Sequence, residues 1–199
     1  MKKAISIGIQ GFSDLREQDC FFVDKTNFIK EWWENRDVVT LITRPRRFGK
    51  TLNMSMLDCF FSNKYANRAD LFEGLSIWQN ETYRKLQGTY PVIFLSFAAV
   101  KAGNLEDAKT QIKQEITRLY WENRNLMKED IFGEDERELY YRTTVKMDDV
   151  TAQDSLRNLS VWMERYYGKK VIILLDEYDT PMQEAYVQGY WDEFTSFVR

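Results

Sequence analysis

The stretch "LITRPRRFGKTLNM", residues 41–54, combines a basic turn with the ending of a phosphate-binding loop. Gly49, Lys50 and Thr51 match the last three positions of the pattern G-x-x-x-x-G-K-[ST]. The first position of that pattern falls on Arg44 rather than on a glycine. The choice is between a nucleotide-binding loop whose first glycine is replaced by Arg44 and a basic turn that contains these three residues by chance.

The residues on either side of this stretch favour the nucleotide site. Residues 37–43, "DVVTLIT", are a β-branched, apolar run that predicts a short buried strand. After the loop, apolar residues recur at helix spacing, at Leu52, Met56, Cys59 and Phe60. A strand, a loop and a helix in this order are the context that the pattern requires.

A loop of this kind binds phosphate through successive backbone N–H groups and the positive end of the helix. We expect Lys50 to reach the outer phosphates and to assist catalysis, and the Thr51 hydroxyl to ligate Mg²⁺. The alternative is that Lys50 and Thr51 simply begin a helix. The expected nucleotide-binding residues are Arg46, Arg47, Phe48, Gly49, Lys50, Thr51 and Leu52.

A second motif follows the most apolar run of the chain, "KKVIILLDEYD", residues 169–179. This run predicts a strand that ends in two acids, and ligands of open α/β sheets bind at the carboxyl ends of the strands. We expect Asp176 to lie on the Mg²⁺ side, through water, and Glu177 to act as the general base toward the attacking water. The alternative is a solvated strand end, which any isolated Asp-Glu pair would suit.

Other patterns extend the same alternation of strands and helices. Residues 90–97, "YPVIFLSF", predict another strand, and apolar spacing predicts helices over 27–35, 105–119 and 156–166. Residues 123–150 are charged and weakly periodic, and we expect an irregular insertion there. The order of these elements predicts an α/β fold with a mainly parallel sheet and helices on both faces.

Composition excludes several kinds of chemistry. The 199 residues contain no histidine, which removes Ser-His-Asp and Cys-His catalysis and imidazole metal sites. Cys20 and Cys59 stand beside phenylalanines, and we expect buried free thiols. The net charge of −3 does not support nucleic-acid binding, although a local basic patch could touch DNA. No apolar run is long enough to span a membrane, so we expect a cytoplasmic protein.

The segments "GFSDLREQDCFFVDKTNFI", "TRPRRFGKT" and "VIILLDEYDTP" resemble the AAA-ATPase-like proteins of bacteria and archaea, relatives of the P-loop ATPases that carry an added catalytic glutamate (ASCE type). The resemblance spans nearly the whole chain. It implies a P-loop NTPase-like domain over residues 1–199, with an N-terminal segment (1–36) and a partial P-loop core (37–199). It also implies ATP and Mg²⁺ as ligands, with Asp176 as the metal-side acid and Glu177 as the base.

The resemblance also bears on the arginines of the loop and on the partners of the protein. Arg44 at the first pattern position is usual in that family. Arg46 and Arg47 add positive charge that suits phosphate contacts, and a solvated basic loop is an equally good interpretation for each of them taken singly. Family members often carry a C-terminal nuclease-like domain, which is absent from these residues, and self-association is a further expectation.

Two functions remain open at this point: an ATPase that couples hydrolysis to a conformational switch, and a nucleotide-binding regulatory or scaffold module with little hydrolysis. A nuclease is disfavoured, because "DEYD" lacks the lysine that such a site needs. In ATPases with the added glutamate, a further strand lies between the phosphate-loop strand and the Asp-Glu strand. Residues 180–199 contain no run that suits this strand, so we expect a C-terminally truncated core with weak or absent ATPase activity and an active full-length protein.

Overall fold

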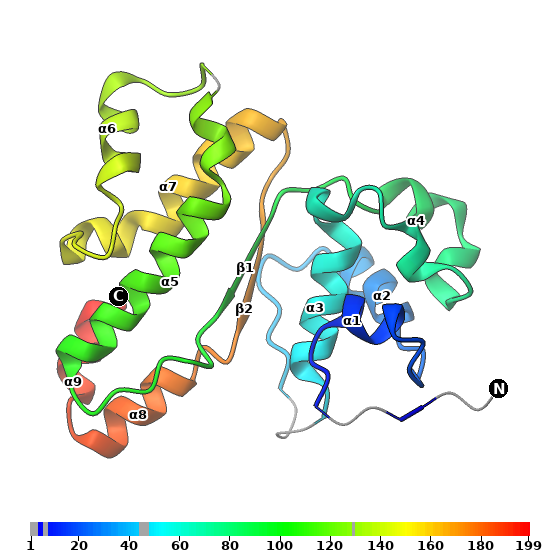
Figure 1. Ribbon diagram of the computed structural model, residues 1–199, viewed down its shortest axis with the longest axis horizontal. Coiled ribbons are helices and arrows are strands. Elements are labelled where there is room, and N and C mark those ends of the chain that lie inside the picture. Colours follow the sequence, from blue (N-terminus) through cyan, green and yellow to red (C-terminus); the bar gives the residue numbers. More distant parts are fainter. Residues whose placement is uncertain (1–3, 6–7, 44–47, 129) are drawn as a thin grey trace. The chain divides into compact units, whose positions relative to one another are not determined.

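The structure is a computed structural model that describes residues 4–5, 8–43, 48–128 and 130–199. The chain divides into two compact units, residues 1–92 and residues 93–199. Each unit has its own helices and its own buried residues, and the two are described separately below (Figure 1).

The first unit is helical. Its elements are α1 (Phe12–Glu17), α2 (Asn27–Asn35), α3 (Lys50–Phe61), η1 (Asn63–Tyr65), η2 (Ala69–Phe72), η3 (Ser76–Gln79) and α4 (Glu81–Leu86). The predicted helix over 27–35 is confirmed by α2. Helix α3 contributes the most completely buried side chains of the unit, among them Met56 and Phe60. Helix α1 packs against α3, so α3 is held from one side by the N-terminal segment.

Aromatic side chains fill the space around α3. The ring of Phe72 stacks on Phe12 with centroids 5.2 Å apart, and it meets Phe60 edge-on at the same distance. Trp33 of α2 stacks on Phe61 of α3, also at 5.2 Å. Offset and edge-to-face pairs of this kind add to the free energy that burial already provides. These rings therefore hold the C-terminal end of α3.

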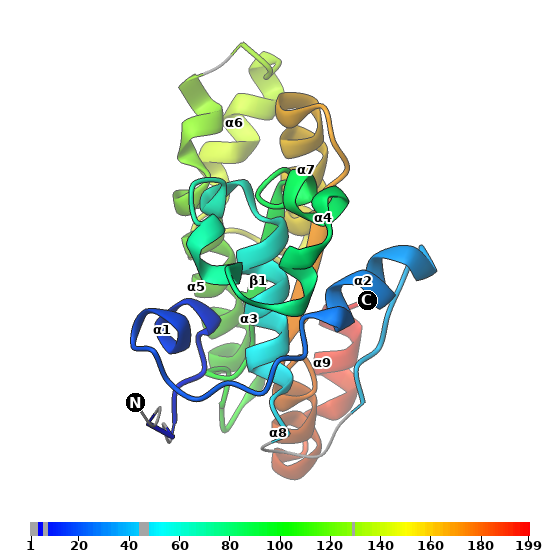
Figure 2. The same cartoon turned by 90° about the vertical axis from the view of Figure 1, so that its right-hand side faces the viewer.

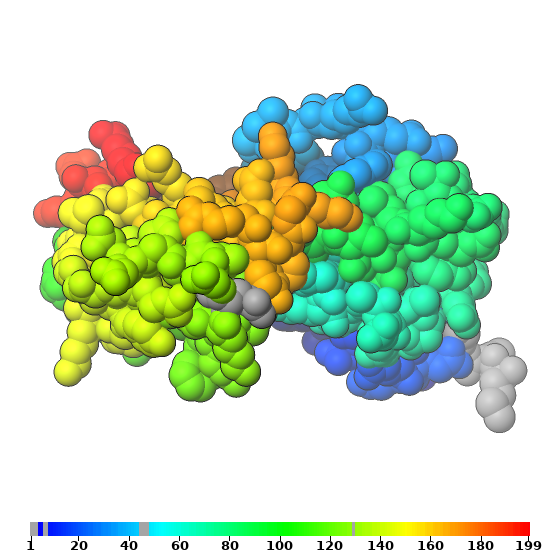
Figure 3. All heavy atoms as spheres, turned by 90° about the horizontal axis from the view of Figure 1, so that it is seen from above, coloured from blue at the N-terminus to red at the C-terminus, as the bar shows by residue number. Residues whose placement is uncertain are grey.

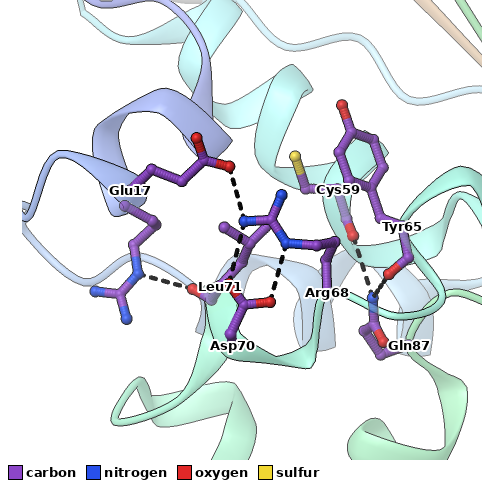
Figure 4. Close-up of polar contacts among 8 residues, drawn as sticks. Glu17, Cys59, Tyr65, Arg68, Asp70, Leu71 and Gln87 are labelled. Carbon is purple, nitrogen blue, oxygen red and sulfur yellow. Dashed lines mark hydrogen bonds and ion pairs between the residues drawn. The ribbon is translucent and has the colours of Figure 1, made fainter.

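Polar side chains tie the loops of this unit to one another. Burial by itself would raise the pKa of the Asp24 carboxyl, but hydrogen bonds from the hydroxyl and N–H groups of Ser76 and Thr26 lower that pKa to about 2. Figure 4 shows a second set, in which the Arg68 guanidinium donates to both Glu17 and Asp70. These bonds join segments about 50 residues apart in the sequence.

The predicted strand over residues 37–43 is wrong. The structure describes bends and irregular chain there, with Val38 fully exposed and Val39 84% exposed. One side-chain hydrogen bond holds this segment to α2, from the Trp32 indole N–H to the Thr40 hydroxyl at 3.1 Å. An apolar β-branched run forms a buried strand only where neighbouring strands accept its hydrogen bonds. Among the residues described in this unit, no strand pairs with it.

The second unit combines helices with a short sheet. The strand β1 (Val92–Ser96) begins at the unit boundary, and the elements that follow are α5 (Leu105–Glu122), η4 (Arg124–Lys128), α6 (Glu134–Arg142), α7 (Asp149–Tyr167), β2 (Ile172–Asp176), α8 (Thr180–Gln188) and α9 (Trp191–Phe197). The predicted strands over 90–97 and 169–179 are confirmed as β1 and β2, and the predicted helices over 105–119 and 156–166 as parts of α5 and α7.

The sheet is smaller than the sequence predicts. β1 and β2 run in parallel as a two-stranded sheet, and the described residues add no third strand (Figure 1). Alternate side chains of β2 differ in burial, since Leu174 is buried while Ile173 and Leu175 are exposed. The observed architecture is therefore mixed α/β and mostly helical, and the expected sheet with helices on both faces is not present among the described residues.

Residues 123–150, which we expected to be irregular, contain η4 and the helix α6. Leu126, Phe132 and Tyr140 from this segment are buried in the core of the unit. The Arg165 guanidinium of α7 pairs with Glu136 of α6, and this pairing, together with the N–H of Gly133, lowers the pKa of Glu136 to about 2 despite partial desolvation. In Figure 3, yellow-green atoms that include those of α6 lie beside the yellow and orange atoms of α7.

Gly88 provides a direct test of the packing in the first unit. Gly88 has φ +68°, and a Cβ atom there would lie 3.0 Å from the backbone nitrogen of Ala66 and closer still to its Cα. Gly74 has a similar φ of +78° with open space around it. We expect Gly88→Ala to lower the free energy of unfolding by ~1–3 kcal/mol more than Gly74→Ala does, as measured by urea denaturation. Equal losses for the two variants would contradict this packing.

Candidate functional site

The N-terminus of α3 is shaped by a glycine in the left-handed conformation. Gly49 has φ 75° and ψ 26°, and α3 begins at the next residue, Lys50. Among the described residues, a Cβ atom at Gly49 would meet no other atom within 4 Å. The glycine is therefore needed for its backbone angles and not for space, because side chains strain the left-handed region.

The first turn of α3 presents backbone donors that lack an acceptor within the helix. The N–H group of Asn53 donates to the Gly49 carbonyl at 3.0 Å, so the donors that precede it in the helix have no intrahelical acceptor. Within this described part of the chain, no side chain caps the helix and no acidic residue stands in its first turn. Lys50 and Thr51, both half-buried, belong to this turn. The arrangement offers N–H groups, a cation and the positive end of a helix to an anion.

The other predicted nucleotide-binding residues differ in exposure, and two of them lie outside the described part of the chain. Phe48 is 62% exposed, and Leu52 is half-buried one residue after Thr51. Arg46 and Arg47, like Arg44, lie outside the described residues. Asn53 is a buried polar residue that the sequence patterns did not single out. Its position, four residues after Gly49 on the same helical face, is the signal that could have indicated it.

The second candidate element is the end of β2. Asp176 is the last residue of this strand and is 4% exposed. Its carbonyl accepts a hydrogen bond from the Phe97 N–H at 2.9 Å, directly after β1. The backbone of Asp176 is thus held by the parallel sheet, at the carboxyl end where ligands of such sheets bind.

Glu177 has an unusual backbone conformation. Its φ is 51°, a left-handed value at a residue that is not glycine. The Thr180 N–H donates to the Glu177 carbonyl at 3.0 Å, and this turn leads into α8, with Pro181 near the start of that helix. A left-handed conformation at a non-glycine residue costs ~1–2 kcal/mol, and such residues cluster at functional sites. The local sequence therefore keeps a carboxylate where a glycine would fit the backbone better.

Two other kinds of site find no support in the described residues. Desolvation raises the pKa of the Cys59 thiol to about 12, so this buried cysteine is a poor nucleophile. Cys20 is also buried and free, and the expectation of two buried free thiols is confirmed.

Across the described ranges, no three His, Cys, Asp or Glu side chains gather as a ready metal-binding group. In the same ranges, every helix is too short or too polar to cross a bilayer.

Comparison with known proteins agrees with the motifs. The sequence profile of the family described as "Predicted AAA-ATPase" matches residues 6–199. A protein of Azotobacter chroococcum mcd 1, named "Uncharacterized protein in vnfD 5'region", is 26% identical over 182 residues, which cover 91% of this chain. The chain spans 30% of the length of that relative. No solved structure matches the chain.

The backbone strain at Glu177 can be measured without any assay of activity. We expect Glu177→Gly to raise the free energy of unfolding by ~0.5–1 kcal/mol, because glycine adopts a left-handed φ without the steric cost. Glu184→Gly, in the interior of α8, is the matched control and should lower the same quantity by ~1 kcal/mol. A loss of stability in Glu177→Gly similar to that of the control would show that Glu177 is not strained.

Proposed function

The chain belongs to the Predicted AAA-ATPase family, and from this premise we propose that it is the ATP-binding domain of a P-loop ATPase. In this proposal the domain binds Mg-ATP, and hydrolysis drives a conformational change. The observation that carries the proposal is the N-terminus of α3, where the N–H groups after Gly49 have no acceptor among the described residues. The activity of the longer protein is part of the same proposal, because the chain spans 30% of its relative.

The phosphates of ATP would bind at the first turn of α3. The N–H groups of Lys50, Thr51 and Leu52 point along the helix toward its N-terminus, where they favour an anion. The Lys50 ammonium adds a charge-assisted contact to the outer phosphates. The sequence RPRRFGK places three further arginines just before this turn, and we assign Arg46 and Arg47 to phosphate contacts on their charge alone.

Mg²⁺ fits the donor set that the chain offers, because hydroxyl and carboxylate oxygens are the ligands it prefers. Thr51 would supply the hydroxyl, and Asp176 the carboxylate, through water. Bound Mg²⁺ would neutralise charge on the phosphates. Asp176 suits this role because its backbone is fixed in the sheet and its side chain is shielded from bulk water.

Glu177 would hold and orient the attacking water and accept its proton. The next residue after a metal-side carboxylate is a suitable position for such a base, and the left-handed backbone at Glu177 turns the chain there. A domain that only bound nucleotide would have no use for a general base at this point. This consideration favours the ATPase over the second candidate, a nucleotide-binding regulatory or scaffold module with little hydrolysis.

Removal of the Lys50 ammonium should weaken nucleotide binding. We expect Lys50→Ala to raise the dissociation constant of Mg-ATP by roughly 10- to 150-fold, because it deletes a charge-assisted contact worth ~1.5–3 kcal/mol. Isothermal titration calorimetry measures this constant directly. Lys85→Ala removes the same charge from an exposed position on α4 and should leave the constant unchanged. Equal affinities in Lys50→Ala and the wild type would sink the phosphate-loop assignment.

Removal of the Glu177 charge should separate binding from hydrolysis. We expect Glu177→Gln to retain Mg-ATP affinity and to lose roughly 10²–10⁴-fold in kcat, since only activation of water depends on the carboxylate. The measurement is steady-state phosphate release in a form of the protein that turns over ATP. Glu184→Gln, with its acid on α8, serves as the control. Wild-type turnover in Glu177→Gln would show that Glu177 is not the general base. The proposal that phosphate binds at α3 would be unaffected by that result.

A further inference from the structure

The helices α8 and α9 form a hairpin that is firmly anchored on one face. They lie side by side at the end of the second unit (Figure 2). Ala185, Phe194 and Phe197 are buried in the core of that unit. The Tyr190 hydroxyl donates to the Ala102 carbonyl at 2.9 Å, and the Gln153 amide donates to the Phe197 carbonyl, also at 2.9 Å. These contacts fix the hairpin to the core.

Large apolar side chains stand on the solvent side of the same hairpin. Tyr186 is 75% exposed, Val187 is 76% exposed and Trp191 is 40% exposed. The rings of Tyr186 and Trp191 meet edge-on with centroids 6.2 Å apart, so these residues form one group and are not scattered singly. Tyrosine and tryptophan are enriched where proteins bind one another, because they bury a large area with few rotatable bonds. We call Tyr186, Val187 and Trp191 the hairpin patch.

The charge around the hairpin patch selects the kind of partner. Asp192 and Glu193, both exposed, follow Trp191 directly, and Glu184 precedes Tyr186 by two residues. The hairpin segment, residues 180–199, contains these three acids and one basic residue, Arg199. This charge repels nucleic acid and anionic lipid, and it would bring acid against acid if two copies paired through the patch. Guanidinium groups, in contrast, pair with carboxylates and stack on exposed aromatic rings.

We propose that the hairpin patch is a docking surface for an arginine-rich, partly apolar peptide segment of a partner protein. Its apolar side chains cover Val187 and the rings of Tyr186 and Trp191, and its arginines pair with Asp192 and Glu193. Since the hairpin is already held by the core, little conformational entropy is lost on binding. This proposal does not depend on nucleotide binding, because its residues differ from those at α3 and at Glu177.

The test uses a fluorescein-labelled dodecapeptide of four Arg-Leu-Gly repeats, with four Glu-Leu-Gly repeats as the charge control. We expect fluorescence anisotropy at physiological salt to show binding of the arginine peptide alone. The double variant Tyr186→Ser/Trp191→Ser should weaken that binding tenfold or more, and so should Asp192→Asn/Glu193→Gln, which keeps the shape of the side chains. Tyr141→Ser is the matched control, since Tyr141 is 67% exposed in the same unit but outside the patch.

Several results would overturn the proposal. Binding of both peptides alike, or equal binding by the patch variants and Tyr141→Ser, would show that the patch does not recognise the peptide. A dimer in sedimentation velocity that the Tyr186→Ser/Trp191→Ser variant dissociates would assign the patch to a second copy. If a longer form of the protein did not bind the peptide, the hairpin patch would be assigned to a contact within the protein itself.

Discussion

Left-handed backbone conformations at two turns are the constraint on which both candidate elements depend. Gly49 adopts φ 75° directly before α3, and Glu177 adopts φ 51° directly after β2. The first conformation precedes the helix start, where we propose that the N–H groups of α3 bind an anion. The second conformation places an acidic residue, Glu177, in a region of backbone angles that is strained for any residue except glycine. Both turns adjoin elements that other parts of the chain hold, since Trp33 of α2 stacks on Phe61 of α3 and β2 is hydrogen-bonded to β1.

Much of the fold could be predicted from apolar periodicity, and the errors have identifiable causes. Helix α5 and strand β2 carry clear periodic or continuous apolar patterns, and both were predicted. Residues 37–43 carry an equally good strand pattern, but a strand also needs partners, which a local pattern cannot supply. Helix α6 was missed because Tyr140 is its one buried residue, so its sequence lacks a wide apolar face.

The two candidate elements, the start of α3 and the end of β2, could be predicted from the sequence to different degrees. Gly49, Lys50 and Thr51 follow a pattern with a physical basis, and the helix start agrees with it. The position of Asp176 at a strand end was also expected from its apolar neighbours. The left-handed conformation of Glu177 was not predictable, because neither glycine nor asparagine, the usual residues for it, stands at this position. The backbone angle, rather than the residue type, is what distinguishes Glu177 from an ordinary strand-end acid.

The central claim is that the N-terminus of α3 receives the phosphates of ATP. The most direct measurement is a two-dimensional ¹H–¹⁵N NMR spectrum of the labelled protein with and without Mg-ATP. We expect the largest changes in chemical shift on the amides of Gly49, Lys50 and Thr51, because phosphate oxygens would accept hydrogen bonds there. Unchanged resonances for these three residues at saturating Mg-ATP, with the largest shifts elsewhere, would contradict the account.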